Sequence, residues 1–190
     1  MPAFQRLLSD LTSGDETRAQ SAVETLGASD ASVLAPLLRL THSSDRDHRW
    51  WAVCALGHTP HARAEHLLPS LNDPDPEVRQ AAALGLCTHV DESAVPGLVV
   101  TLSDTDPMAP GLAVNALVKI GPAAVPALLR VMEDAPQGIR IMALRALAEI
   151  KDQRAIPIML KVMQEDSALL QHWARAGLER LGLDMVYIKP

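Results

Sequence analysis

The sequence predicts an all-α protein made of stacked helical hairpins, and three columns of residues with a common period support this prediction. An alanine recurs every 30 or 31 residues, and a leucine follows each alanine four positions later, so each pair lies on one face of a helix. A third column places a helix-capping residue before five of these six helices. Such a period is typical of solenoid arrays. The alanines are Ala22, Ala52, Ala82, Ala113, Ala143 and Ala174, and the leucines are Leu26, Leu56, Leu86, Leu117, Leu147 and Leu178.

The stretch from Asp75 to Leu102 shows the repeating unit most clearly. Asp75 is a good N-cap for a first helix, and Pro76 suits the first helical position because its missing amide would have no partner there. A polar break, THVDES, leads to a second helix that Pro96 opens. The predicted first-helix caps are Asp15, Asp45, Asp75, Asp106 and Ser167, with Pro136 as the exception; the prolines near the second-helix starts are Pro36, Pro96, Pro126 and Pro157, with His66 in that place in the second hairpin.

We expect a single domain over residues 1–190, with about five hairpins between two capping helices. The Gly182 position suits a residue just past a helix end, and the tail after it either folds back over the last helix or extends free. Capped ends favour a complete unit. The predicted segments are an N-terminal capping helix at 1–12 with Pro2 near its start and Phe4 in its apolar stripe, five hairpins at 13–166, a C-terminal capping helix at 167–182 and the tail at 183–190.

Two of the predicted hairpins carry prolines where a regular helix would not have them. Pro69 falls inside the second helix of the second hairpin, where proline removes a backbone donor and clashes with the preceding turn. This helix is therefore expected to be short or kinked. The fourth hairpin has Pro107 and Pro110 followed by Gly111, so its first helix is expected to start late or bend.

Composition narrows the possible functions. The chain is 48% hydrophobic but only 3% aromatic, so aliphatic side chains must form the core. A formal charge of -6 is unfavourable for nucleic-acid binding, which needs cationic surface to displace counterions from phosphate. Two cysteines do not make a disulfide framework, and no apolar run approaches a membrane span. The N-terminus lacks a signal pattern, so we expect a soluble, cytoplasmic protein that binds neither nucleic acid nor membrane.

The tryptophans divide by column. Trp51 aligns with Trp173 and with apolar residues of the other hairpins, so both are expected in the core. Trp50 falls in a mixed column. It is either an exposed interface anchor, a frequent role of exposed tryptophan, or a ring that lies flat against its neighbours.

The segments DPDPEVRQAAALG, SAVPGLVVTL and VNALVKIGPAAVPALLRVM resemble HEAT repeats of the bacterial type known from phycobilisome lyases, and the resemblance covers about residues 13–182. It implies a right-handed α–α superhelix. Arg49, Arg79 and Arg140 match the family's first-helix arginine, which the resemblance implies should pair with aspartates of the same or neighbouring repeats. The resemblance is specific for fold and poor for function, because this repeat serves scaffolds, adaptors and some enzymes.

Several residues in the turns carry metal-binding groups. His58 and His61 fall in the turn of the second hairpin, while Cys87 and His89 fall in the equivalent turn of the third. Imidazole and thiolate are zinc ligands, but this spacing is not a standard finger pattern. We therefore expect solvated turn residues, with no bound metal or cofactor. Cys54 is expected to be a small core residue that forms no bridge with Cys87.

With no catalytic constellation in view, the sequence favours a non-enzymatic interaction module that docks another protein. The docking surface is expected on the concave face of the second helices or at the irregular second hairpin, since repeat proteins bind through extended surfaces. The alternative is a bilin lyase or related chromophore-handling protein, with His58, His61 and Trp50 near the ligand. The expected partner-binding residues are Trp50, His58, His61, Arg39, Arg130 and Lys161. The identity of the partner and the oligomeric state leave no trace in the sequence.

Overall fold

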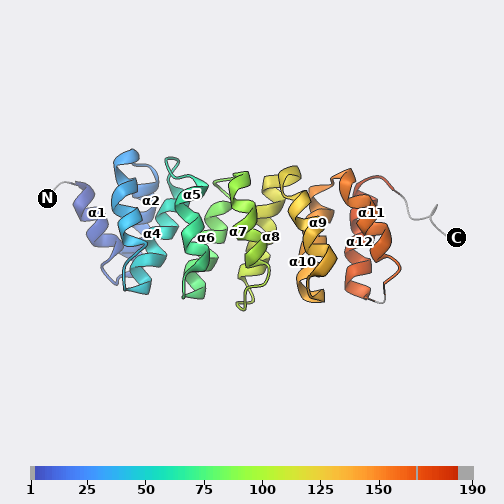
Figure 1. Ribbon diagram of the computed structural model, residues 1–190. Helices are drawn as coiled ribbons and strands as arrows, with labels where there is room; N and C mark the ends of the chain where they lie inside the picture. The colour runs from blue at the N-terminus through green and yellow to red at the C-terminus, as the bar shows by residue number, and fades with distance from the viewer. Residues whose placement is uncertain (1–2, 166, 184–190) are drawn as a thin grey trace. The chain divides into compact units, whose positions relative to one another are not determined.

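The computed structural model describes residues 3–165 and 167–183, and this part of the chain contains helices and loops but no strand (Figure 1). The chain divides into two compact units, residues 1–94 and 95–190. The order of the helices agrees with hairpins placed between two capping helices. The prediction of an all-α protein built of helical hairpins is confirmed.

The first unit begins with a capping helix that packs on α2 and also contacts α4. The first helices α2, α4 and α6 then pack side by side (Figure 1). Its elements are α1 (Ala3–Leu11), α2 (Glu16–Gly27), η1 (Ala31–Val33), α3 (Leu34–Leu40), α4 (Arg46–His58), α5 (Ala64–Leu67), η2 (Leu68–Asn72), α6 (Pro76–Leu86) and η3 (Glu92–Ala94).

The second unit repeats this arrangement. Its first helices α8, α10 and α12 pack in the order of the chain. The second helix α9 packs against α10, and α11 packs against α12. Its elements are α7 (Val95–Thr101), α8 (Ala109–Ile120), η4 (Gly121–Ala123), α9 (Val125–Asp134), α10 (Gln137–Ile150), η5 (Gln153–Ala155), α11 (Ile156–Val162) and α12 (Ala168–Arg180).

The alanine and leucine columns form the core of both units. All six leucines are fully buried, and the six alanines are at most 2% exposed. Small side chains at the alanine column let neighbouring helices approach closely, while the leucines fill the space between layers. Fully burying a leucine contributes about 1.5–3 kcal/mol, so this one column is a main source of stability.

Most helix starts follow the predicted caps. The carboxylates of Asp15, Asp45 and Asp75 each accept a hydrogen bond from an amide of the first turn, and Ser167 does the same for α12. The fourth first helix starts late, as its prolines predict: α8 begins at Ala109, and Pro110 occupies its first turn. Pro136 precedes α10 and provides no side-chain cap.

The irregular second hairpin also agrees with prediction. Its second helix is broken into α5, which has four residues, and the 3-10 segment η2, where Pro69 lies in the first turn. Proline cannot donate the backbone hydrogen bond that would continue α5. The helix is therefore short.

The prediction that Trp51 and Trp173 belong to the core is wrong. Both side chains are half-buried, and so are the residues that share their column in the other hairpins: Ala81, Leu112 and Met142. The alanine one position later is fully buried in each of these helices. One position rotates a side chain about 100° around a helix, so this column lies along the edge of the packed face. An apolar column there does not require burial.

Some predictions fall on residues outside the described ranges. Pro2, the side chain of Phe4 and the tail from residue 184 onward belong to this group, so the docking of the tail stays a prediction. Gly182, just before the tail, is described and has a φ of 79°. This is the left-handed conformation expected of a residue just past a helix end. The single-domain prediction likewise stays a prediction.

Within the described residues, no single helix is long and apolar enough to cross a membrane. One pair, Ala109–Ala123 with Val125–Asp134, passes on length and composition together, but the two helices are bent by 120° at their junction.

Candidate functional site

A hollow of about 530 Å³ opens in the first unit where the N-terminal end of α4 faces the turn between α1 and α2. This volume falls within the range of roughly 300–1,000 Å³ that is typical of small-molecule sites. Stacking of the repeats brings together lining residues that are distant in the sequence. They are residues 11–14 at the end of α1 and in the turn, Glu16 on α2, residues 45–48 with Trp50 and Trp51 around the start of α4, and Glu77 on α6.

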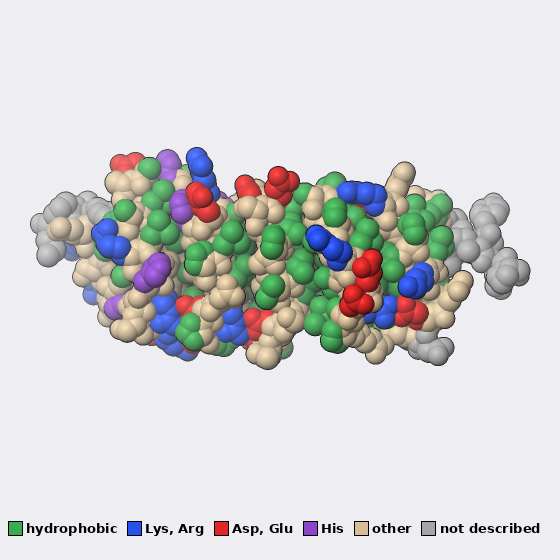
Figure 2. Space-filling view, viewed as in Figure 1, with side chains coloured by type: hydrophobic (Ala, Val, Ile, Leu, Met, Phe, Trp, Pro, Cys, Tyr) green, Lys and Arg blue, Asp and Glu red, His purple; other side chains and the backbone are tan. Residues whose placement is uncertain are grey.

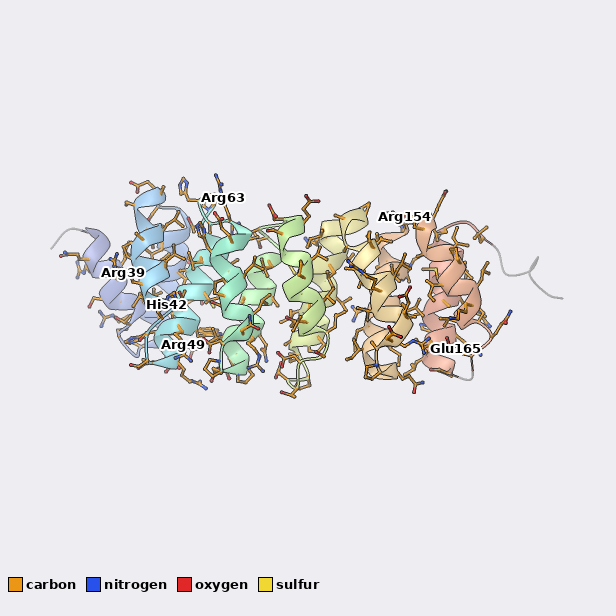
Figure 3. The ribbon with its side chains drawn as sticks, viewed as in Figure 1. Arg39, His42, Arg49, Arg63, Arg154 and Glu165 are labelled. Carbon is orange, nitrogen blue, oxygen red and sulfur yellow. The ribbon has the colours of Figure 1, made fainter. Side chains whose placement is uncertain are left out.

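A buried ion pair holds the start of α4 in place. The guanidinium of Arg49 donates two hydrogen bonds to the carboxylate of Asp73, at 2.8 and 2.9 Å, and a third to the carbonyl oxygen of Ser43 at 3.0 Å. The two charged side chains are only 13% and 8% exposed. The bidentate pair therefore ties the first turn of α4 to the loop before α6. In Figure 3, Arg49 lies at the lower end of the first unit, while Arg63 lies at its upper end.

This pair confirms the aspartate partner that the family resemblance implies for Arg49. The equivalent Arg140 pairs instead with a glutamate, since its Nη2 lies 2.6 Å from Glu165 Oε1. Arg79 donates to the carbonyl oxygens of Asp73 and Pro74. The arginine column thus keeps its role of tying loops together even where the acid changes.

Two adjacent indole rings line the hollow. The ring centroids of Trp50 and Trp51 lie 4.5 Å apart with their planes at 74°, an edge-to-face arrangement. Both side chains are half-buried, so each retains exposed ring surface. Indole rings offer large, rigid faces for a flat conjugated ligand. Trp50 therefore packs edge-to-face against its neighbour Trp51, and its role as an interface anchor stays a prediction.

The charges around the hollow are predominantly negative. Four carboxylates line it, those of Glu16, Asp45, Asp47 and Glu77, against the single guanidinium of Arg46. With His48 neutral, four negative charges and one positive charge leave a formal charge of -3. Hydrogen bonds from the amides of His48 and Asp47 lower the pKa of the Asp45 carboxyl, so this group is ionised at neutral pH.

The one lining guanidinium is already paired. Arg46 Nε lies 3.0 Å from Asp47 Oδ1, and its two terminal nitrogens lie 3.3 Å from Asp75 Oδ2 and 3.2 Å from Glu77 Oε2. The hydrogen bond to Asp47 and the charges of Glu77 and Asp75 raise the pKa of Arg46. Arg46 is thus engaged with three protein carboxylates and is a poor receptor for a carboxylate of a ligand.

The hollow contains Trp50 but neither of the histidines that the sequence placed beside it. His58 ends α4, and its Nδ1 lies 2.8 Å from the carbonyl oxygen of Cys54. Eight residues separate it from Trp50, which corresponds to roughly 12 Å along the helix axis. His61 lies exposed in the loop beyond. As partner-binding residues, His58 and His61 stay predictions.

The three cations predicted to bind a partner lie exposed on second helices. Arg39 is on α3 of the first unit, and Figure 3 shows it beside His42. Arg130 on α9 and Lys161 on α11 belong to the second unit. None of them lines the hollow, and their role in binding stays a prediction.

The metal-ligand candidates do not form a cluster. His89 Nε2 lies 3.1 Å from the carbonyl oxygen of Leu56, and Cys87 Sγ donates to the carbonyl oxygen of Ala83 at 3.6 Å. Across the described residues, no group of three or more histidine, cysteine or acidic side chains is arranged to hold a metal ion. Six of the seven histidines belong to the first unit, and those visible in Figure 2 lie over it.

Neither cysteine forms a disulfide, and neither is fully buried. Burial nevertheless raises the pKa of the Cys54 thiol to about 12. This thiol is therefore neutral and unreactive at neutral pH.

Sequence reasoning did not find the acids of the hollow, although the repeat contains a signal for them. Asp47 and Glu77 stand 30 residues apart, each two positions after a capping aspartate. Equivalent positions of successive repeats lie on adjacent helices, here α4 and α6. Aligning the acidic residues by the repeat period would have predicted that Asp47 and Glu77 lie close together on adjacent helices.

The sequence model of the HEAT repeats family matches residues 64–138 and 111–179, which together cover more than half of the chain. The chain belongs to the HEAT-repeat family. Two curated relatives of this HEAT protein carry functional names. One is the phycobilisome maturation protein of Synechococcus elongatus, 36% identical over 55% of this chain and 50% of that protein. The other is the phycocyanobilin lyase subunit beta of Nostoc sp., 34% identical over 49% of this chain and 46% of that protein.

The match to these two relatives spans about half of their length. Among solved structures, the complex of CpcE and CpcF of phycocyanin lyase from Nostoc is similar with a TM-score of 0.57. It is 22% identical in sequence and covers 96% of this chain and 78% of that chain. At this identity, the likeness concerns the fold.

The names of the relatives contradict the prediction of a non-enzymatic scaffold. One relative is named for phycobilisome maturation and the other as a subunit of a phycocyanobilin lyase. That prediction was wrong because most positions of the repeat carry residues that the stack itself requires. The absence of a catalytic constellation in those positions therefore says little about activity.

Proposed function

We propose that this HEAT protein is a bilin lyase subunit or a related chromophore-handling protein. In this role it holds a linear tetrapyrrole while the pigment is attached to, or detached from, a partner protein. The observation that carries the proposal is the identity of 36% and 34% to relatives named for phycobilisome maturation and phycocyanobilin lyase.

The hollow at the start of α4 is the pigment site that we propose. A linear tetrapyrrole is a flat conjugated chain of four pyrrole-type rings with nitrogen donors along one edge and two propionate groups on the other. The rings of Trp50 and Trp51 provide surfaces for stacking, and the carboxylates of the hollow are acceptors for pyrrole N–H groups. The volume of about 530 Å³ is of the right order for such a ligand.

We further propose that the protein acts together with a second protein chain. One relative is named as a subunit of its lyase, and the similar solved structure is a complex of two chains. The partner that fits this chemistry is either a second HEAT subunit or the protein that carries the pigment.

The proposal is tested by mixing the purified protein with a linear tetrapyrrole and recording visible absorbance as the protein concentration rises. We expect a saturable spectral change. Trp50→Ala is expected to raise the Kd about tenfold, because the loss of one stacked indole costs about 1.4 kcal/mol, near the upper end of aromatic pair energies.

Trp173→Ala is the matched control for this titration. Trp173 is also half-buried on a first helix, but it belongs to the second unit, where its ring lies 5.7 Å from the Arg145 guanidinium. This variant should bind pigment like the wild type. An unchanged spectrum in the wild-type titration would refute pigment handling. Equal losses in the two variants would show that the pigment binds elsewhere.

A further inference from the structure

The hollow carries more negative charge than the simple holding of a pigment requires. Its formal charge is -3, yet a linear tetrapyrrole with two ionised propionates is itself an anion when its ring nitrogens are neutral. An anionic ligand should avoid such a site unless part of it becomes positive. The ring system of a linear tetrapyrrole does so when it takes up one proton at its nitrogens.

We propose that the hollow selects the protonated, cationic ring system of a linear tetrapyrrole and directs its propionates outward to solvent. This inference rests on the proposed function and specifies the chemical form of the ligand. The site consists of the indole pair together with the carboxylates, since each feature favours a cation by a different interaction.

The indole pair supplies the first interaction. A delocalised cation is attracted to the negative face of an aromatic ring, and tryptophan binds cations best among the side chains. Trp50 and Trp51 present two ring surfaces at 74° to each other within one hollow. A protonated ring system can lie against one of these surfaces while its edge meets the other.

The carboxylates supply the second interaction. The charge of Arg49 also acts on Asp45, but this guanidinium is paired with Asp73. The charged or titratable lining residues are Glu16 of α2, Asp45, Arg46, Asp47 and His48 at the start of α4, and Glu77 of α6. The positive charge of Arg46 is shared among three carboxylates, one of which, Asp75, lies outside the lining. Near the turn, Arg18 of α2 pairs with Asp10 of α1, so these two charges cancel.

Opposite charge within about 4–6 Å favours the charged form of a titrating group, typically by a factor of ten or more in its protonation equilibrium. For pigment bound in the hollow, we therefore expect the ratio of protonated to neutral form at a given pH to rise about tenfold over free pigment. The same charges repel carboxylate, so the propionates must point away from the lining.

The first experiment titrates the visible absorbance of bound and free pigment with pH, because protonation changes the absorbance spectrum. The variant Asp47→Asn/Glu77→Gln removes two exposed carboxylates of the hollow and leaves the Asp45 cap intact. It also leaves Arg46 paired with Asp75 alone, which further disfavours a cation. We expect this variant to bring the protonation of bound pigment back to near that of free pigment.

The charge-matched control is Glu92→Gln/Glu133→Gln. It removes two exposed carboxylates outside the hollow, one from each unit, and so changes the net charge of the protein equally. This control should retain the tenfold enrichment of the protonated form.

The second experiment needs no variant and compares the pigment with its dimethyl ester on the wild-type protein. Esterification removes both propionate charges, so the ester should bind at least as tightly as the diacid. If pigment binds but titrates like free pigment, or if the ester binds tenfold more weakly, the inference is overturned while the proposed function stands. If no pigment binds, both are overturned.

Discussion

The pair formed by Arg49 and Asp73 shows how this repeat places charge inside a layered core. Burial by itself would raise the pKa of the Asp73 carboxyl, but hydrogen bonds from Arg49 and from the Asp75 amide, with the charges of Arg49 and Arg79, lower it below its usual range. The ionised form is therefore the one that the fold stabilises. The pair also fixes the start of α4, on which the proposed pigment site is built.

We predict that Asp73→Ala lowers the free energy of unfolding by about 3 kcal/mol at neutral pH, because it leaves the guanidinium of Arg49 buried without its partner. The pKa of Asp73 is lower in the folded state than in the unfolded state. The stabilisation is therefore complete above the unfolded pKa of about 3.9 and is lost as pH falls through the folded pKa.

Urea denaturation at a series of pH values measures this effect. The wild type should lose more stability than Asp73→Ala below about pH 4, so that the two curves converge in acid. Asp134→Ala, an exposed acid at the end of α9, is the control and should parallel the wild type. A constant difference between wild type and Asp73→Ala at every pH would rule out the ionised pair as the cause.

Predictability from sequence differs from one residue to the next. The role of Arg49 was predicted from the family resemblance, which implies an aspartate partner for the arginine at this position. Trp51 was misplaced because an apolar column can lie along the edge of a packed face as well as inside it. The acids of the hollow escaped notice because their meaning depends on neighbours some 30 residues away in the chain.

At the scale of whole helices, a glycine allows close packing only where it faces a neighbouring helix. Gly177 of α12 faces α11 and α10: a Cβ added there would lie 2.5 Å from Met159 Cε and 3.1 Å from the backbone Cα of Ala148. Met159 is fully buried and cannot move into solvent without loss. The absence of a side chain at Gly177 is therefore a condition for packing these three helices.

We predict that Gly177→Ala destabilises the protein by about 1–3 kcal/mol through overpacking. The matched control is Gly138→Ala in α10, where an added Cβ meets no atom within 4 Å. This control should be neutral or stabilising by up to about 1 kcal/mol, because alanine is the better helix former. Thermal unfolding of both variants distinguishes the two cases, and a stabilised Gly177→Ala would disprove the close-packing account.

Element boundaries followed local chemistry and were therefore predictable. Prolines shorten α5 and delay the start of α8, and the side-chain oxygens of aspartate and serine start most of the other first helices. The hollow follows from no single element. It arises where the capping helix α1 ends, the α1–α2 turn leaves space and the start of α4 presents two indoles. Predicting such a site from the sequence requires knowledge of how neighbouring helical layers meet.

Across the molecule, the same leucine column supports every first helix, and within each unit neighbouring first helices pack against one another. Stability in such arrays is approximately a sum of repeat and nearest-neighbour contributions. A core defect should therefore loosen the layers around it more than distant layers. Leu56 of α4 and Leu147 of α10 are equivalent, fully buried positions, one in each unit, and allow this expectation to be tested symmetrically.

We predict that Leu56→Ala, which should cost about 2–5 kcal/mol, accelerates amide exchange in α2, α4 and α6 roughly a hundredfold. Amides of α8, α10 and α12 should keep nearly wild-type rates. Leu147→Ala should give the reverse pattern, which makes each variant the control for the other. Native-state hydrogen exchange with helix-level assignment measures both. Equal acceleration of all six helices in each variant would mean that the chain opens as one cooperative unit, and the nearest-neighbour description would then fail.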